Sequence, residues 1–191
     1  MSRCFRVIPF LALAGFLGRT ANAGDFMGPP IPYRYTSIKT EACHPPQGRQ
    51  LAAFEEREVG AKECQGLDGW QLFLVYTEDA SWMEIARNGA LWSTREQIAG
   101  PSRFGNSPNV GSDGVEWLPP EGEADTLIFH LEAREPPTAN GPGKRISRVA
   151  VVSLTGEAPQ FCGLVNTNEQ AKIVAEKRDS CNSGLQRHPW Q

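Results

Sequence analysis

The sequence predicts an α+β fold: a single domain with one twisted antiparallel sheet, open or curled towards a barrel, one C-terminal helix and two disulfides. Three observations lead to this expectation. Short apolar runs with the two-residue period of strands alternate with Gly and Pro turns over most of the chain. A convincing helical period appears only near the C-terminus. An even number of cysteines remains once the N-terminal leader is set aside. We expect about six to eight strands with the helix packed across them.

Residues 1–23 have the three parts of a secretory signal peptide. Arg3 and Arg6 supply the positive start, residues 7–18 form an apolar core, and residues 21–23 match the A-x-A cleavage pattern. The apolar core is shorter than the roughly 20 residues needed to cross a bilayer, so we expect no membrane insertion after cleavage. The alternative is a buried first helix, which the order of charges disfavours. The expected location is therefore periplasmic or secreted.

The mature chain is long enough for one domain with one real core. We expect an extended arm at residues 24–32, because Gly and Pro there forbid regular structure, a domain at residues 33–181, and a flexible tail at residues 182–191.

The charge of the mature chain excludes one class of partner. Loss of the leader lowers the number of basic residues from 19 to 16 against 22 acidic ones, a formal charge of −6. Binding to nucleic acid needs a clustered basic surface, and the compact group of Lys144, Arg145 and Arg148 is typical of a solvated strand end. We expect no nucleic acid partner.

The first elements of the domain are strands. Aromatic and β-branched residues alternate with others from Tyr33 towards Cys43, which predicts the first strand. Residues 50–63 fit two states, because their composition favours a helix, whereas their length, Gly60 and the hairpin that follows favour an irregular strand. We expect the strand, with the helix as the alternative.

Residues 64–89 are the densest apolar segment after the leader and predict the central hairpin of the sheet. Asp68-Gly69 provides a turn, residues 70–76 an aromatic and β-branched strand, and residues 81–87 a return strand that ends at Asn88-Gly89. This hairpin carries no recognisable chemistry.

The second half of the domain continues in strands separated by loops. A short strand at residues 90–93 precedes a polar loop at residues 94–114, which is long enough to be functional. Strands follow at residues 115–118 and 126–134, and residues 149–152 form the best candidate for a strand buried on both faces. One face of the second of these strands is apolar: Leu127, Phe129, Leu131 and Ala133.

The period changes to that of a helix after a last strand at residues 161–165. Asn166 followed three positions later by Glu169 is typical of an N-cap with its reciprocal partner. The apolar positions that follow lie on one helical face, and the helix is expected to end before Cys181.

Four cysteines, Cys43, Cys64, Cys162 and Cys181, survive removal of the leader. In an oxidising compartment an even count predicts disulfides, and four cysteines allow three connectivities. We expect Cys43–Cys64 and Cys162–Cys181, because each pair flanks a local unit that can bring its ends together. A zinc site is the alternative, with His44 as its only hint, since structural zinc favours close pairs such as C-x2-C.

Catalytic motifs are poorly matched. The nearest approach to the G-x-S-x-G elbow of hydrolases, residues 100–105, has its second glycine one position late. His130 lies within a strand, where a hydrogen-bonded sheet histidine is the simpler interpretation. The acidic runs at residues 55–58 and 121–125 offer paired carboxylates, as glycosidases use, but in a small acidic protein such runs usually form a solvated face. We expect no cofactor, no metal site and no enzyme activity.

The tryptophans are the more useful signal, because they supply large contact area with few rotatable bonds. The chain has five: Trp70, Trp82, Trp92, Trp117 and Trp190. Burial in the core accounts for at least three. Trp92 and Trp117 flank the loop at residues 94–114 and, together with Arg103 and Phe104 inside it, form the candidate binding surface.

Several short motifs occur in a familiar order. They are Tyr35-Thr36 with Cys43, Cys64 with G-x-x-G-W, Val115-Glu116-Trp117, the F-C-G-x-V-N run of residues 161–166, and Cys181. In this order they resemble a group of small exported alpha-proteobacterial proteins of unknown function with four cysteines. The resemblance implies export and paired cysteines, and it carries over no catalytic residue.

These observations favour a non-enzymatic, exported binding or inhibitor-like module that acts on a protein or an envelope polymer; the inhibitor variant rests on fold analogy. The alternative is a small cell-envelope hydrolase. A hydrolase would place His130 or a carboxylate pair in a concave pocket, whereas a binding module would expose an apolar or aromatic patch.

Overall fold

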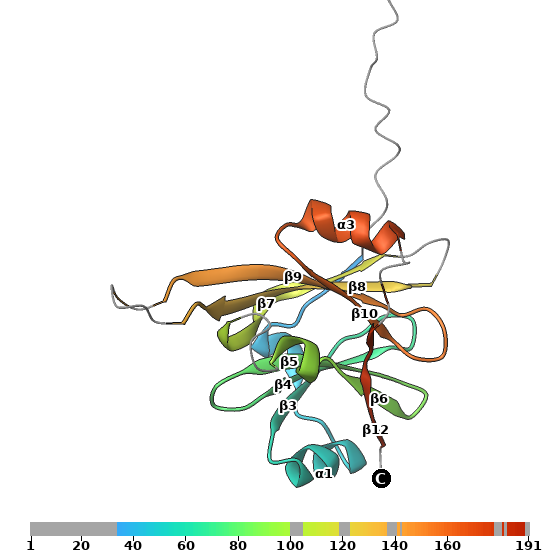
Figure 1. Cartoon of the computed structure of the whole chain (residues 1–191). Coiled ribbons are helices and arrows are strands. Elements are labelled where there is room, and N and C mark those ends of the chain that lie inside the picture. Colours follow the sequence, from blue (N-terminus) through green and yellow to red (C-terminus); the bar gives the residue numbers. More distant parts are fainter. Residues whose placement is uncertain are drawn as a thin grey trace, which may run out of the picture. The chain divides into compact units, whose positions relative to one another are not determined.

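The structure is a computed structural model that describes residues 34–99, 105–118, 123–136, 141, 143–177, 181 and 183–189, all within one compact unit of residues 31–191. Over these residues the chain forms twelve strands, three α-helices and one 3-10 helix. The strands make two antiparallel sheets of six strands each, which Figure 1 shows one above the other.

The first sheet has the strand order β1-β7-β8-β9-β10-β11. Its strands are β1 (Arg34–Thr36), β7 (Asn106–Leu118), β8 (Thr126–Arg134), β9 (Arg145–Ser153), β10 (Gln160–Val165) and β11 (Ser183–Gly184). The predicted alternation of β8 is confirmed, since its four apolar positions are buried in the core. Residues 149–152 of β9 are buried on both faces, as expected.

The second sheet has the order β12-β6-β5-β4-β3-β2. Its strands are β2 (Cys43–His44), β3 (Gly60–Cys64), β4 (Gln71–Tyr76), β5 (Ser81–Arg87), β6 (Ala90–Ser93) and β12 (Gln186–Pro189). The central hairpin of β4 and β5 is confirmed. Asn88 and Gly89 have φ angles of 52° and 76°, the positive values that a tight two-residue turn needs at both positions.

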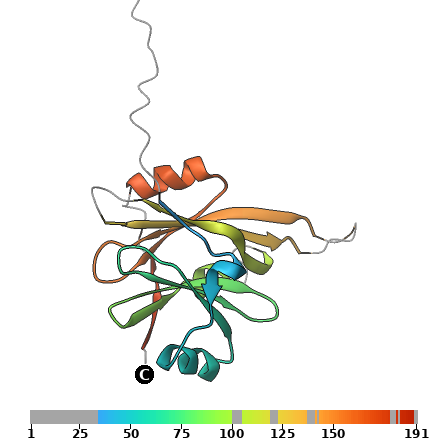
Figure 2. The ribbon, with the colours of Figure 1, turned by 180° about the vertical axis from the view of Figure 1, so that it is seen from behind.

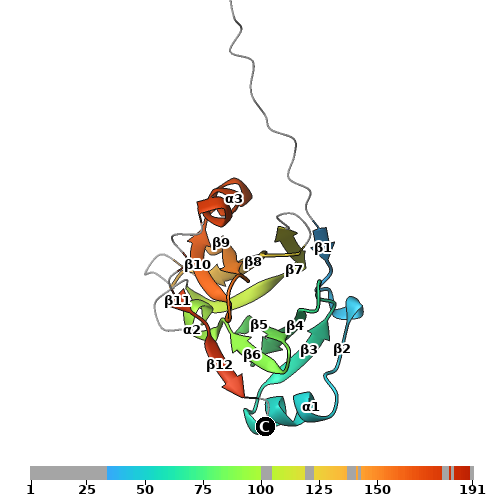
Figure 3. The ribbon, with the colours of Figure 1, turned by 90° about the vertical axis from the view of Figure 1, so that its right-hand side faces the viewer.

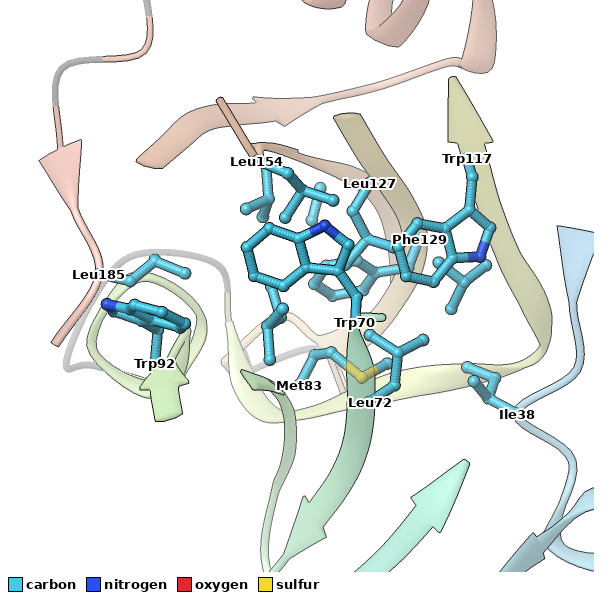
Figure 4. Close-up of a cluster of buried hydrophobic side chains, with 14 of the residues drawn as sticks. Ile38, Trp70, Leu72, Met83, Trp92, Trp117, Leu127, Phe129, Leu154 and Leu185 are labelled. Atoms are coloured by element: carbon cyan, nitrogen blue, oxygen red, sulfur yellow. The ribbon is translucent and has the colours of Figure 1, made fainter. Parts of the chain in front are cut away.

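The two sheets pack face to face around one apolar cluster. Figure 4 shows Trp117, Leu127 and Phe129 of the first sheet directed towards Leu72 and Met83 of the second. The inward positions of both sheets thus share a single core. This arrangement removes the rings of Trp70, Trp92, Trp117 and Phe129 from water, and burial of apolar surface is the dominant stabilising contribution in a small domain.

The helices cover the outer faces of the sheets. Helix α3 (Asn168–Lys177) lies on the first sheet, where Ala171 and Ala175 pack on apolar residues of β8 and β9, and α1 (Arg49–Glu56) lies on the second, where Phe54 packs on β4 and β5. Figures 1 and 2 show these two helices on opposite sides of the stacked sheets. The remaining helices, α2 (Arg95–Ile98) and the 3-10 turn η1 (Thr40–Ala42), are short.

The expectation of an α+β fold with one sheet and one helix is wrong. Over the described residues the fold is mostly β, with two antiparallel sheets and three α-helices. Period-two alternation identifies the buried face of a strand but does not say whether a helix or a second sheet covers it. The shortest strands, of two to four residues, are also too brief to show a period.

Three local predictions need correction. Residues 50–63 contain helix α1 followed by strand β3, where we expected one strand throughout. Most of the described part of the expected 94–114 loop belongs to α2 and β7. The helix cap lies one position later than predicted, because the Thr167 hydroxyl accepts from the Gln170 backbone N–H, and the Gln170 side chain accepts from the Asn166 backbone N–H.

The C-terminal residues 183–189, expected to form a flexible tail, pair with both sheets. Strand β11 pairs with β10 and β12 pairs with β6, and Leu185 between them is buried in the shared core. Figure 3 shows this red segment running from one sheet to the other. A single buried leucine with strand pairing on each side holds the segment in place, which polar composition alone did not predict.

Both predicted disulfides are confirmed. Cys43 and Cys64 are directly opposite each other on β2 and β3, and Cys162 on β10 is bonded to Cys181 beyond α3. The first pair closes the edge of the second sheet, and the second ties α3 to the first sheet. Among the described helices, none is both long and apolar enough to cross a membrane.

Candidate functional site

Trp92 and Trp117, two residues of the candidate binding surface, are core residues. Trp117 is completely buried and donates from its indole nitrogen to the Thr36 hydroxyl at 2.9 Å, and Trp92 is only 5% exposed. The expectation of exposed indole rings at these positions is not met, because both side chains point inward from their strands. Arg103 and Phe104 lie outside the described residues.

A surface cleft lies elsewhere, on the outer face of the first sheet. It has a volume of about 410 Å³ and receives side chains from β1, β7, β8 and the first turn of α3. We call it the Glu116 cleft. The side chains that carry its chemistry are Tyr35, Ser37, Glu116, Ile128, His130 and Asn168.

The strand register brings these residues together. Glu116 of β7 is opposite Tyr35 of β1 on one side and Ile128 of β8 on the other. Because side chains alternate between faces along a strand, His130 lies on the same outer face as Ile128. Asn168 begins α3, which packs on this face. Residues separated by more than 130 positions in sequence therefore line one cleft.

Two glycines lie in the part of β7 that runs beside His130 and Thr36. The register between β7 and β8 shifts between Val110 and Val115, and this irregular stretch contains Gly111 and Gly114. A Cβ atom at Gly111 would lie 3.3 Å from the Cβ of His130, and one at Gly114 would lie 3.0 Å from the Thr36 carbonyl oxygen. Larger residues at these two positions would crowd the strands that frame the cleft.

Glu116 is the unusual residue of the cleft. Its side chain is only 6% exposed, and its buried Oε1 atom has no hydrogen-bond partner among the described residues. The buried Oδ1 atom of Asn168 is likewise without a partner there. A buried acceptor left unsatisfied costs about 1–3 kcal/mol. Both acceptors belong to residues that line the cleft, and a buried polar group without a partner requires an explanation.

Ser37, His130 and Glu116 give the same cleft the three residue types of a serine hydrolase triad. A serine hydrolase needs a chain of hydrogen bonds from the nucleophile to the histidine and from the histidine to an acid. Among the described residues no such hydrogen bond joins Ser37, His130 and Glu116, and the Ser37 hydroxyl instead accepts from the Lys39 backbone N–H at 3.3 Å. The three residue types of a triad are present, but the hydrogen bonds that would join them are not found among the described residues.

Metal binding has no support in the described part of the chain. No group of three or more His, Cys, Asp or Glu side chains gathers there in a way that could hold an ion. His44, the residue considered for a zinc site, lies next to a cysteine that is oxidised in a disulfide.

Sequence reasoning singled out His130 but did not connect it with Glu116. The signal was present in the Val115-Glu116-Trp117 triplet, where a carboxylate stands between two buried apolar residues of one strand. A charged residue in such a strand faces either solvent or a site. The contribution of Asn168 and Tyr35 depends on tertiary structure and had no local signal.

The fold and the cleft define a class: a disulfide-linked protein of two face-to-face antiparallel sheets with a carboxylate-containing cleft on one outer face. Comparison of the chain with protein-family models, with curated proteins and with solved structures gives no match.

Proposed function

We propose that this is an exported, non-enzymatic binding protein that holds a protonated amine or guanidinium group of its partner in the Glu116 cleft. The observation that carries the proposal is the buried and unsatisfied Oε1 atom of Glu116. A carboxylate only accepts hydrogen bonds, whereas ammonium and guanidinium groups only donate them. A partner group of this kind supplies both the donor and the opposite charge.

The rest of the cleft suits the same ligand. The Asn168 Oδ1 atom adds a second acceptor, and Tyr35, 68% exposed at the rim, offers an aromatic ring to the stem or the cation of a long basic side chain. Lysine and arginine side chains of a protein, or the amino groups of an envelope polymer, carry such groups. The formal charge of −6 for a chain without its leader favours encounter with a basic partner.

Export is supported by the leader pattern of residues 1–23 and by the two disulfides, which form and persist in oxidising compartments. On this proposal the leader is removed after Ala23, and the protein works in the periplasm or outside the cell, as the resemblance to small exported proteins with four cysteines implies.

Titration with N-acetyl-lysine amide and with N-acetyl-arginine amide, followed by NMR or calorimetry, tests the proposal. We expect Glu116→Gln to weaken binding about tenfold, because hydrogen bonds to a charged acceptor are the stronger ones. Glu132→Gln is the matched control. Glu132 lies on β8 on the same outer face as His130, and it pairs with Arg145 at an exposed site. Binding that is absent, or equal in wild type and Glu116→Gln, contradicts the proposal.

The same variant should not lose stability without ligand. Because the Glu116 carboxylate has an unsatisfied buried oxygen, its neutral amide is expected to be at least as stable as the wild type in thermal unfolding. A binding site is often less stable than its neutral replacement. If the Glu116 carboxylate had a purely structural role, its replacement would lower the free energy of unfolding.

The second candidate function is a small cell-envelope hydrolase, favoured by the presence of Ser37, His130 and Glu116 on one cleft. A fluorophosphonate probe distinguishes the two, because it labels only an activated serine. Labelling of Ser37 that is lost in His130→Gln would establish the hydrolase and overturn the non-enzymatic proposal. Absence of labelling, together with amine binding that depends on Glu116, supports the binding protein.

A further inference from the structure

A second pocket, separate from the Glu116 cleft, lies at one end of the stacked sheets. It has a volume of about 470 Å³ and is formed by the end of β5, the β5–β6 turn, the turn between β9 and β10, and strand β12. We call it the two-arginine pocket. Its lining includes Trp70, Arg87, Asn88, Trp92, Glu157 and Arg187.

Strand pairing places Arg187 in this pocket. Arg187 of β12 is directly opposite Trp92 of β6, so both side chains leave the second sheet on the same side. The neighbouring His188 faces the other way, towards a separate pocket beneath α1. The C-terminal strand, expected to be a flexible tail, therefore places the Arg187 guanidinium on one face of the second sheet and the His188 ring on the other.

Arg87 lies on the same face of the second sheet, on β5, with strand β6 between it and Arg187 on β12. Its guanidinium lies 4.9 Å from the centre of the Trp70 ring, a cation–π contact that restrains it. Its ion pair with Glu123 is long, at 3.7 Å, and Glu123 itself is largely exposed. Arg87 is thus held in position while its hydrogen-bonding capacity is only weakly used.

Among the side chains that line the pocket, guanidinium groups outnumber carboxylates, and Glu123, which pairs with Arg87, is not part of the lining. Two guanidinium groups line the pocket against one carboxylate, Glu157, which is exposed on the β9–β10 turn. Among the described residues, Arg187 has no ion-pair partner. Two like charges on one pocket repel each other unless an anion lies between them.

Two residues of the pocket lining, Trp70 and Trp92, each have a buried indole N–H without an acceptor among the described residues. The indole of Trp92 is 95% buried, and its Nε1–H has no acceptor among the described residues. Figure 4 shows this nitrogen at the end of the ring that points away from Trp70. A ligand that carries acceptors rather than donors would suit such a site.

We propose that the two-arginine pocket binds an oxyanion, either a carboxylate or a phosphate group, of a small polar ligand. Arginine forks match both groups in a bidentate geometry, which makes the pair of guanidiniums more selective than two point charges. The amide of Asn88 on the turn adds a further polar contact to the remainder of the ligand. This site is opposite in charge to the Glu116 cleft and does not depend on the function proposed for that cleft.

Titration with three small probes tests the proposal: glucuronate, inorganic phosphate and neutral glucose. Intrinsic tryptophan fluorescence is a direct readout, because Trp70 and Trp92 line the pocket, and calorimetry gives the affinity. We expect glucuronate or phosphate to bind and glucose not to bind. Binding of glucuronate alone indicates a sugar acid, and binding of phosphate alone indicates a phosphorylated ligand.

Arg187→Gln is the informative variant, because the exposed Arg187 can be replaced without disturbing the core. We expect it to weaken oxyanion binding about tenfold, while Arg145→Gln, at an exposed arginine outside the pocket, leaves binding unchanged. The variant Glu116→Gln should also leave it unchanged. The proposal is overturned if none of the probes binds, if glucose binds as tightly as glucuronate, or if Arg187→Gln binds the anions like the wild type.

Discussion

Arg57 and Glu84 form a bidentate ion pair in which the carboxylate has no exposed surface. The two terminal guanidinium nitrogens of Arg57, which follows α1, donate to the two oxygens of Glu84 on β5. Trp82 and Ser93 donate to the same carboxylate, each at 2.9 Å. The pair fastens α1 to the outer face of the second sheet, and the carboxylate is fully satisfied, in contrast to that of Glu116.

Replacement of Glu84 by alanine should be strongly destabilising. It leaves the partly buried Arg57 and the donors of Trp82 and Ser93 without their acceptor, and loss of one partner of a buried pair costs about 3–5 kcal/mol. Urea unfolding measures the free energy of unfolding of the wild type and of each variant. Glu132→Ala, which breaks the exposed pair with Arg145, is the control and should cost less than about 1 kcal/mol. Equal losses in the two variants would contradict this account of the pair.

The stability of the protein should fall on mild acidification because of His188. Burial and, second, the positive charge of Arg57 hold the pKa of His188 below its usual value of 6.5. Folding therefore favours the neutral ring. This contribution is complete above the pKa of the unfolded state and is lost as the pH falls through the lower pKa of the folded state.

Unfolding measured between pH 5 and pH 8 tests this linkage. Relative to wild type, His188→Gln should flatten the fall in stability over the lower part of this range, whereas His44→Gln, at an exposed position, should not. If both variants follow the wild-type curve, His188 does not control the response. A loss of the β12 signals in NMR before global unfolding would place the effect at the C-terminal strand.

Asp68 is expected to link the first strand to the second sheet in a pH-dependent way. It accepts two hydrogen bonds from Arg34 and one from the Ala124 backbone N–H. The hydrogen bonds from Arg34, followed by that from Ala124, hold the pKa of Asp68 below its usual 3.8. The carboxylate therefore stabilises the fold above that pH, and the contribution is lost as the pH falls through the lowered pKa.

The variant Asp68→Asn keeps a residue that tolerates the φ of 52° found at this position, so the change removes charge rather than backbone fit. We expect a loss of about 1–2 kcal/mol at pH 7, because hydrogen bonds to charged groups contribute about 1.5–3 kcal/mol and partial exposure of this pair to solvent reduces that contribution. The difference from wild type should shrink below pH 4. A matched Asp79→Asn variant on the exposed β4–β5 turn should show neither effect.

The two disulfides should each contribute measurably to stability. They close loops of 21 and 19 residues in sequence separation, for which the chain-entropy relation gives about 3 kcal/mol each. The double variants Cys43→Ser/Cys64→Ser and Cys162→Ser/Cys181→Ser, compared by urea unfolding, measure each bridge separately. Peptide mapping by mass spectrometry without reduction checks the pairing; free thiols in the exported protein would contradict it.

Sequence alone determined the features that depend on residues close together along the chain. The β4–β5 hairpin, its Asn88-Gly89 turn, the strand buried on both faces at 149–152 and the last helix were predicted because turn chemistry and side-chain period act over a few positions. The cysteine pairing followed from the same local reasoning.

Tertiary structure decided the rest. Alternation in β8 predicts a buried face, but only packing showed that a second sheet covers it. The polar segment at 183–189 became two strands because Leu185 enters the shared core. The Glu116 cleft joins side chains from four elements, and the two-arginine pocket depends on the register of β12 with β6. Such sites arise from contacts between residues distant in sequence, for which no local pattern exists. The sequence therefore shows which residues are present but does not show that they lie close together in space.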